Sequence, residues 1–578
     1  MPGIPGQFFK EFGVTVAVAV VCSLAVARFV SPLMAAYFLT KPKKLHDARK
    51  LPAFYEKTLT WALDHRWIAS GLGFLTLLGG GWVAGQLPTG FIPKEDLGYI
   101  QFQIDAPSGT TIDQMSRAAQ DLDKLMHAQP DVEHVFISIG STGANGDLTS
   151  GSATLVMPEH HKVTTEDLKQ RIRPLLNQIP DIRVTALLSG GGPGGADVDI
   201  ILASENGPAL DKAQMALLQE MRKMPQIRNP RLFPSPPGPQ LIIRPRAAEA
   251  SRLNVSTDEI AAVARIATTG DIEANTPKFS EGKRRLPIRV RLPEAVKLDV
   301  ATLSNLRLPT REGGATTLGA VADITFEQGP SRIQRYERQR RADVQADLAP
   351  GMASGQATAA VDRSETITHL PSDVKRAAIG NEQAQQQMMS GIIVALLAGV
   401  ALIYSVMVLL FRSVFKPIAI LMSLPLAFSG AFLALFIVHM EISMPVMIGC
   451  VLLLGIAAKN AILLVEFTIE AEDRGKSARE AIFEACRERA RPIVMTTVAM
   501  SAGMLPTALG IGEGAGFRQP MAVAVIGGLI SSTVLSLVLV PVIYSFVDGF
   551  ERWLKPLAGK LATPRTADDD KLLKGGEL

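Results

Sequence analysis

Hydrophobic positions follow two different patterns along the chain. Seven continuous apolar runs are each long enough to cross a bilayer as a helix. They lie at 14–39, 68–87, 388–411, 417–439, 442–467, 490–510 and 519–548. The stretch between the second and third runs instead mixes strand-like alternation with helical spacing. The pattern therefore predicts an α-helical polytopic membrane protein with about seven spans and a large α+β region outside the bilayer.

The α+β region is predicted to contain two split βαβ units. Alternating apolar positions from Ile100 to Ile104 indicate its first strand. The first unit is expected over 95–193. The second unit is expected over 194–246 and 339–380, and includes a strand at 240–244.

Residues 247–338 interrupt the second unit and are expected to form an inserted subdomain. They contain a helix of their own, which begins with the capping box Ser256 to Glu259. The loop SGGGPGG at 189–195 separates the two units. It is not a phosphate-binding loop, because no Gly-Lys-Ser/Thr follows and the chain enters a strand. We expect a hinge, with these candidate residues: Gly190, Gly191, Gly192, Gly194 and Gly195.

Basic residues set the expected topology. They follow the first apolar run between Lys41 and Lys50 and the fifth run over 474–491, whereas the loops 440–441 and 512–519 hold a single arginine. By the positive-inside rule, the α+β region lies outside the cytoplasm. The start at 1–13 is then also outside, and these segments are cytoplasmic: 40–67, 469–489 and 549–578. An outside N-terminus with an odd number of spans predicts that the chain is the later part of a longer protein.

Composition supports this picture and excludes several functional classes. The 578 residues are 47% hydrophobic and 20% charged, with a mean hydropathy of +0.21, which is too apolar for an ordinary soluble enzyme. The net charge of +4 is small, and without a basic stripe it does not predict nucleic-acid binding. The adjacent His160 and His161 lack accompanying ligands, so no metal site is predicted. The sequence contains no recognisable catalytic constellation or nucleotide-binding motif.

A lysine lies inside the fifth apolar run. Lys459 follows Gly455 by one turn and stands among small residues such as Ala458, so neighbouring helices can approach this face closely. A charge at the centre of a spanning helix costs roughly 3 kcal/mol and usually faces a bundle interior or a water path. One interpretation is a cation that pairs with a carboxylate and releases it when the acid is protonated. The alternative is a lysine that snorkels to the cytoplasmic side.

Further polar residues mark the start of the sixth run. Arg489 and Arg491 precede it, and Thr496 and Thr497 lie within it. Arginines at a cytoplasmic helix end are ordinarily topology determinants, and threonines in membrane helices usually bond to their own backbone. The pattern alone leaves the function of these residues open.

Several strings resemble the C-terminal half of resistance-nodulation-division efflux pumps of the hydrophobe/amphiphile type. The most specific are GIAAKNAILLVEF at 455–467, RARPIVMTT at 489–497 and MLPTALGIGEGAGFRQPMAVAVIGG at 504–528. The strings QFFKEFGVTVAVAV at 7–20 and FIPKEDLG at 91–98 resemble the same family at matching places. The resemblance covers essentially the whole chain.

The resemblance implies a drug/proton antiporter of the Gram-negative inner membrane, driven by the proton motive force without a bound cofactor. The two α+β units would be the third and fourth periplasmic porter subdomains, and 247–338 the docking subdomain. Family members work as homotrimers with a periplasmic adaptor protein and an outer-membrane channel, and their C-terminus is cytoplasmic. They are built from two halves, so the resemblance also implies that an N-terminal half is missing from this chain.

The resemblance assigns roles to residues of the membrane part. Lys459 matches the relay lysine of the family, with Asn460 beside it, Thr496 matches the relay threonine, and Arg489 matches the cytoplasmic-side arginine. In the family the lysine pairs with two aspartates of the first half. This chain does not contain that half, so we expect the chain alone to be unable to couple protons.

The loop that separates the two drug pockets of the family departs from the usual pattern. It reads GSTGANGDLTSG at 140–151 and lacks aromatic residues, although Phe136 just before it is retained. Phe136, Ser141 and Thr154 are the candidate pocket residues. Fewer aromatic anchors predict a different or less aromatic cargo.

Two alternative functions stay open. One is an exporter of metal ions or lipids with the same fold, which the Lys459-Asn460 pair and the absence of methionine or carboxylate clusters near the hinge disfavour. The other is a non-transporting assembly module that docks adaptors or partner subunits without moving a cargo.

Overall fold

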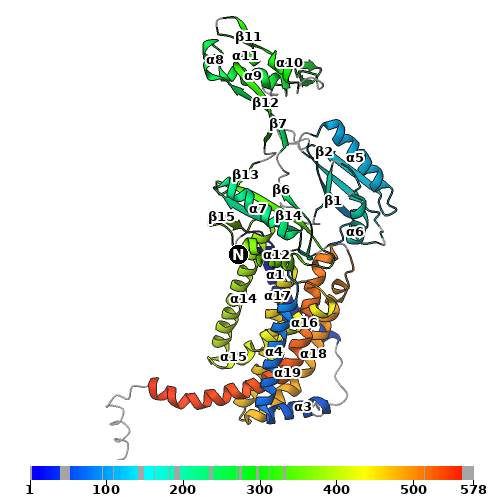
Figure 1. Ribbon diagram of the computed structural model, residues 1–578. Helices are drawn as coiled ribbons and strands as arrows, with labels where there is room; N and C mark the ends of the chain where they lie inside the picture. The colour runs from blue at the N-terminus through cyan, green and yellow to red at the C-terminus, as the bar shows by residue number, and fades with distance from the viewer. Residues whose placement is uncertain are drawn as a thin grey trace, which may run out of the picture.

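The computed structural model has a bundle of long helices at one end and an α+β region at the other (Figure 1). It describes residues 3–38 and 52–562 apart from short gaps. The gaps are residues 91, 94, 108–109, 141–148, 160, 162, 177, 181, 188–195, 234–237, 269, 272–275, 289, 294–298, 312, 330–332 and 513. The predicted hinge glycines from Gly190 to Gly195, the pocket residue Ser141 and the loop residue His160 therefore lie outside the described residues.

Long apolar helices make up the bundle. In chain order they are α1 (Gly3–Ala25), the π-helical turn η1 (Val26–Val30), α2 (Ser31–Phe38), α3 (Ala53–Asp64), α4 (Arg66–Gln86), α14 (Asn381–Phe411), α15 (Lys416–Leu421), α16 (Ser423–Val438), α17 (Met444–Asp473), α18 (Ala478–Ala508) and α19 (Ala515–Ala562). Within the described residues, six stretches are long and apolar enough to cross a membrane: Phe9–Phe38, Arg66–Gln86, Glu382–Phe411, Lys416–Val438, Met444–Asp473 and Ala515–Leu554.

The expected run at 490–510 lies in the second half of α18, which is not among these six stretches. The expected cytoplasmic helix 469–489 differs from the structure, because the chain breaks between α17 and α18. Ser477 caps α18, with its Oγ accepting from the backbone of Glu480, and Gly475 in the break has a φ of +88°. Pro492 lies inside α18 without ending it.

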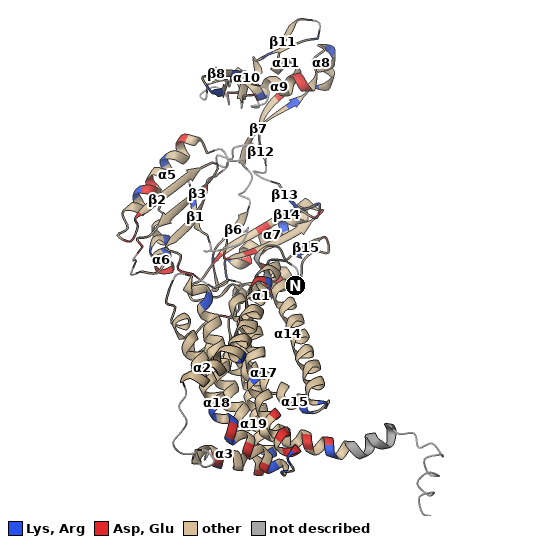
Figure 2. Ribbon diagram, turned by 180° about the vertical axis from the view of Figure 1, so that it is seen from behind, with Lys and Arg blue, Asp and Glu red and all other residues tan. Residues whose placement is uncertain are grey.

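Small residues let α16 and α19 approach closely at the centre of the bundle. A Cβ atom added to Gly430 of α16 would lie 2.7 Å from the carbonyl oxygen of Gly527, and one added to Gly527 would lie 2.7 Å from that of Gly430. Buried Leu453 of α17 packs into the same core. The spanning stretch of α1 and α2, in contrast, has no buried residue. Charged residues are sparse in the middle of the bundle and gather at its lower end, near α3 and along α19 (Figure 2).

The first unit of the α+β region is an antiparallel sheet covered on one face by two helices. Its elements are β1 (Tyr99–Asp105), α5 (Ile112–His127), β2 (His134–Ile139), β3 (Ser150–Val156), α6 (Thr165–Leu176) and β4 (Arg183–Ala186), and its strand order is β2-β3-β1-β4. Phe102, Ile104 and Leu155 are buried beneath the helices. The alternation of the sequence thus places polar positions of the same strands on the opposite face.

The second unit is a five-stranded antiparallel sheet. Its elements are β5 (Val198–Ser204), α7 (Gly207–Met221), β6 (Ile227–Phe233), β13 (Gln334–Tyr336), β14 (Gln339–Leu348), α12 (Ser354–Asp362), α13 (Glu365–Thr368) and β15 (Val374–Ala377). The strand order is β13-β14-β5-β15, and β6 pairs with β14. Val344 of β14 and Ile200 of β5 are buried with residues of α7 and α12.

The strand expected at 240–244 exists but does not belong to this sheet. It is part of β7 (Gly238–Pro245), which among the described strands pairs only with β12 (Ala322–Gly329). In the sheet of the second unit, β6 instead pairs with β14. It contains Pro230, and its register with β14 is irregular. Proline is tolerated on an edge strand at such an irregularity, but it interrupts the alternation of apolar and polar residues by which a strand is recognised in a sequence.

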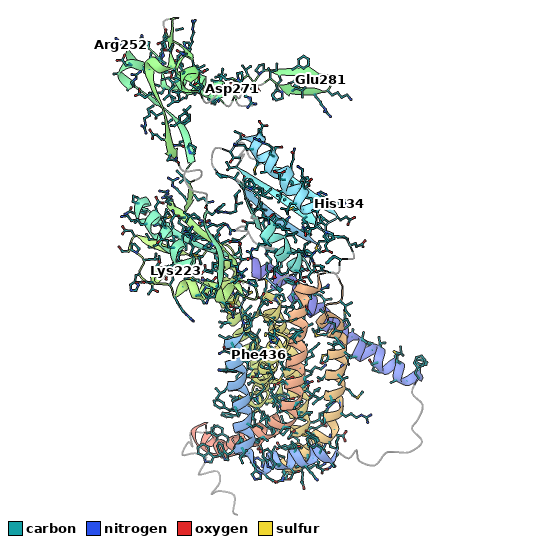
Figure 3. The ribbon with its side chains drawn as sticks, turned by 45° about the vertical axis from the view of Figure 1, so that its right-hand side comes forward. His134, Lys223, Arg252, Asp271, Glu281 and Phe436 are labelled. Carbon is teal, nitrogen blue, oxygen red and sulfur yellow. The ribbon has the colours of Figure 1, made fainter. Side chains whose placement is uncertain are left out.

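The two strands β7 and β12 carry an inserted subdomain away from the second unit (Figure 1). Its elements are α8 (Ala247–Arg252), α9 (Thr257–Thr268), β8 (Lys278–Glu281), β9 (Arg284–Pro287), α10 (Val300–Ser304), β10 (Arg307–Pro309), β11 (Ala315–Thr317) and α11 (Leu318–Val321). Its own core includes Ile260, Leu308 and Leu318. The β8–β9 hairpin, with Glu281 at its turn, extends outward from this subdomain (Figure 3). In coarse terms, the expected fold class of membrane helices with a mixed α/β region is confirmed.

Candidate functional site

Lys459 lies on a face of α17 that the rest of the described chain leaves uncovered. Lys459 is exposed, as are Gly455 and Glu466 on the same side of the helix. A Cβ atom added to Gly455 would meet no atom within 4 Å. Lys459 makes no hydrogen bond or ion pair with any residue that the structure describes. The opposite side of α17, with Ala457 and Ala461, is buried in the bundle.

Asn460 points to a different side of α17 from Lys459, because consecutive helical residues are about 100° apart. Its side chain is only 2% exposed. The Nδ2 group has no hydrogen-bond partner among the described residues. An unpaired buried amide is costly, so this position is available for a polar neighbour or a water molecule. The Lys459-Asn460 pair is therefore adjacent in sequence but divided between the open face and the packed core.

The two threonines of α18 also differ in their surroundings. Thr496 is exposed, and its Oγ1 donates to the carbonyl oxygen of Ile493 at 2.9 Å. Thr497 is buried; its Oγ1 lies 3.0 Å from the same carbonyl and 2.6 Å from Oγ1 of Thr533 on α19. Thr497 thus joins two helices within the chain. Thr496 has no hydrogen-bond partner outside its own turn within the described chain, and it lies on an uncovered side of α18.

Arg489 connects the first half of α18 with the C-terminal part of α17. The central carbon of its guanidinium lies 3.6 Å from the centre of the Phe467 ring, which is a close cation–π contact. Its Nε is buried and has no hydrogen-bond partner in the described part of the chain. Lys459, Thr496 and Arg489 therefore come from two neighbouring helices, but no hydrogen bond or ion pair within the described residues joins them to one another.

Two of the candidate pocket residues, Phe136 and Thr154, lie on the open face of the first unit. Phe136 of β2 stands directly opposite Thr154 of β3, and Thr154 stands opposite Gln101 of β1. Phe136 is 68% exposed. This face, which α5 and α6 do not cover, therefore presents the ring of Phe136 beside small and polar side chains, with Tyr99 at the start of β1 on the same face. Figure 3 shows the first unit, marked by His134, beside the second, marked by Lys223.

The structure also shows a short connecting segment at 88–90, here called the strap, which the sequence did not predict. The backbone of Pro88 to Gly90 pairs with Ile442 in the loop before α17, through bonds from Ile442 N to Pro88 O (2.8 Å) and from Gly90 N to Ile442 O (3.0 Å). In addition, the backbone N–H of Gly355 in α12 donates to Thr89 O at 3.0 Å. The segment 88–90 thus joins the helix of Lys459 to the second unit. These are backbone contacts between distant segments, for which the sequence carries no side-chain signal.

Comparisons with known proteins agree with this architecture. Residues 1–548 match the model of the AcrB/AcrD/AcrF family. Relatives include the multidrug resistance protein MdtC of Salmonella paratyphi A, 29% identical over 563 residues, and that of Pantoea ananatis, 31% identical over 574 residues. Each alignment covers 95% of this chain, but 54% and 55% of the relative. The chain therefore spans about half the length of the curated relatives that it matches.

A solved structure supports the fold. The crystal structure of a heavy metal efflux pump resembles this chain with a TM-score of 0.71 and 23% identity, over 86% of this chain and 52% of that one. At this level of identity the likeness concerns the fold alone. Since the family model matches nearly the whole chain, this protein belongs to the AcrB/AcrD/AcrF family of resistance-nodulation-division efflux transporters.

Proposed function

We propose that this chain is part of a proton-driven pump that exports amphiphilic drugs or related small molecules by drug/proton antiport. It works in the inner membrane of a Gram-negative bacterium, as a transporter and not as an enzyme. The α+β region faces the periplasm, and the C-terminus is cytoplasmic. The proton motive force supplies the energy, and no other cofactor takes part.

One observation carries this proposal: a lysine with no partner among the described residues lies on the uncovered face of a membrane helix. A buried or membrane-embedded cation needs a counter-charge, and a carboxylate in the bilayer would supply it. In this mechanism Lys459 pairs with an ionised acid from another helix and releases it when the acid takes up a proton. Thr496 lies on the neighbouring helix as a further relay group, and Arg489 holds the first half of α18 and the C-terminal part of α17 together.

The acid must come from outside this chain in our proposal. The chain spans about half of its relatives' length, and the spanning stretch of α1 and α2 has no buried residue. An N-terminal half of the pump would cover such faces and bring the acidic partner to Lys459. The assembled pump acts as a homotrimer with a periplasmic adaptor protein and an outer-membrane channel.

Phe136 and Thr154 contribute to the cargo path in this proposal. Because they share the open face of the first unit, a flat apolar molecule can stack on the ring while polar neighbours orient it. Replacing Phe136 with Ala should weaken export of aromatic dyes several-fold more than export of non-aromatic cargo.

An efflux assay in a host without its own pumps tests the relay. The chain is expressed alone or together with a polypeptide that corresponds to the first half of its relatives. We expect energy-dependent dye export only from the pair, and Lys459→Met should abolish it. Lys57→Met, at an exposed position of α3, is the matched control and should leave export unchanged. Export that survives Lys459→Met would exclude the proposed relay.

A further inference from the structure

A row of charged residues is buried on the second unit, on the sheet face opposite to α7 and α12. Along β14, Arg341, Asp343, Gln345 and Asp347 alternate with apolar residues and therefore share this face. Asp343 is fully buried, and Asp347 is 7% exposed. The membrane relay makes no use of these side chains. Since buried charges are costly, the arrangement needs an explanation of its own.

Two arginines of the same sheet neutralise two of the carboxylates. Arg341 donates to both oxygens of Asp343, from Nε and Nη2, each at 2.6 Å. Arg231 of β6 donates from Nη1 to Oδ1 of Asp347 at 3.0 Å. The first pair lies within β14, whereas the bond from Arg231 connects β14 to β6 of the same unit.

A third arginine comes from the first unit. Arg173, in the last turn of α6, forms an ion pair with Oδ2 of Asp347. Burial acts to raise the pKa of Asp347, but Arg231 and Arg173 outweigh it and hold that pKa below its usual range. Asp347 therefore stands between an arginine of its own unit and an arginine of the neighbouring one. This ion pair is a contact between the two units.

Asp199 lies beside this row on β5 and, in contrast to Asp343 and Asp347, forms no ion pair with an arginine of the described residues. It lies on β5 directly opposite Gln345, and its Oδ1 is buried with no hydrogen-bond partner among the described residues. Burial, reinforced by the carboxylate of Asp343, raises the pKa of Asp199 to about 7, although Arg341, Gln345 and Arg231 act in the other direction. Asp199 therefore gains and loses a proton near neutral pH.

The charge balance of this face depends on that proton. With Asp199 ionised, the second unit contributes three carboxylates, Asp199, Asp343 and Asp347, against two arginines, and Arg173 of the first unit completes the balance. With Asp199 protonated, the unit's own charges cancel, and Arg173 becomes an excess cation in a largely buried site. Three further charged groups share this face by strand register: Asp197 before β5, Lys375 on β15, and Arg228 of β6, which stands opposite Asp347 with an exposed side chain. Asp197 and Lys375 offset each other, and solvent screens the exposed charge of Arg228, so the balance of the buried groups still depends on Asp199.

We propose that Asp199 is a proton-binding site that controls how α6 of the first unit docks on β14 of the second. Ionised Asp199 favours the ion pair between Arg173 and Asp347, and protonated Asp199 favours its release. The ligand is a proton from the compartment that the α+β region faces. This site is separate from Lys459, and its operation does not depend on transport.

Distance measurements on the full chain in detergent test this proposal. Spin labels are attached by Gln120→Cys on α5 and Lys212→Cys on α7, both at exposed positions, in a Cys22→Ser background. We expect the distribution of distances between the units to broaden and lengthen as the pH falls, with a midpoint near 7. A distribution that stays the same from pH 5 to pH 8.5 would overturn the proposal.

Three variants separate the proposed cause from general effects. Asp199→Asn should show the low-pH distance distribution at every pH. Arg173→Gln should also show the low-pH distance distribution at every pH, although this position is 26% exposed and the substitution leaves the buried side chains of β5 and β14 in place. Glu205→Gln, an exposed acid at the end of β5, should titrate like the wild type. A pH transition that persists in both Asp199→Asn and Arg173→Gln would assign it to other groups. The spectra report distance and not export, so the result stands whether or not the chain is part of a proton-driven pump.

Discussion

At the scale of single residues, charges in this protein are distinguished by what surrounds them. Lys459 is exposed on a membrane helix and has no partner in the described chain, Arg489 rests on an aromatic ring, and Asp199 is buried beside other acids. Sequence reasoning found Lys459, because a lysine in an apolar run is unusual. It missed Asp199, because an acid in an alternating strand looks like a solvated position until the neighbouring strands are known.

The contact of Arg489 with Phe467 predicts a measurable loss of stability. A cation–π contact contributes about 0.5–2 kcal/mol, with the larger values for desolvated pairs. Arg489→Gln should therefore lower the thermal unfolding midpoint of the chain in detergent, and Phe467→Leu should produce a similar loss. The control is Arg491→Gln, since Arg491 is exposed and lies on the same helix. An equal loss in the control would show that positive charge in this part of α18, and not the ring contact, stabilises the protein.

The pKa of Asp199 predicts how stability varies with pH. The folded protein retains a proton up to about pH 7 that the unfolded chain releases near pH 4. The stabilisation from this group is thus complete below about pH 4 and is lost as the pH rises through 7, at about 1.4 kcal/mol per unit of pKa difference. Asp199→Asn should remove this trend, so the variant should gain in stability relative to the wild type between pH 5 and 8. A constant difference in unfolding midpoint across that range would contradict the raised pKa.

At the scale of elements, regular patterns were predictable and tertiary contacts were not. The alternation from Ile100 to Ile104 predicts a strand, and β1 is found there. The strand at 240–244 was placed in the wrong sheet, because periodicity does not specify a partner. β6 was missed because Pro230 interrupts its pattern. Likewise, the strap at 88–90 consists of backbone bonds between segments far apart in sequence.

The strap predicts that a single methyl group disturbs the connection between the membrane helices and the second unit. A Cβ atom on Gly355 would lie 2.6 Å from the carbonyl oxygen of Thr89, so the backbone must shift. Gly355→Ala should cost about 1–3 kcal/mol and increase hydrogen exchange at the backbone amides of Gly90 and Ile442. Gly81→Ala is the control, since a Cβ there meets nothing within 4 Å. Unchanged exchange at both amides in Gly355→Ala would show that the strap does not depend on this close approach.

At the scale of the whole molecule, the chain provides one side of an arrangement that we propose another polypeptide completes. It belongs to the AcrB/AcrD/AcrF family and spans about half of its relatives' length. The helix of Lys459 is buried on one side and uncovered on the other. The sequence could predict this lysine and its helix, but only the folded bundle shows which face is left without a neighbour.

Proton flux in proteoliposomes tests this central claim most directly. The chain is reconstituted alone or with the first half of a relative, a pH gradient is imposed, and proton movement is recorded after a drug is added. The account predicts drug-dependent proton flux from the assembled halves and none from the chain alone or from the assembly with Lys459→Met. Drug-dependent proton flux from this chain alone would contradict the account.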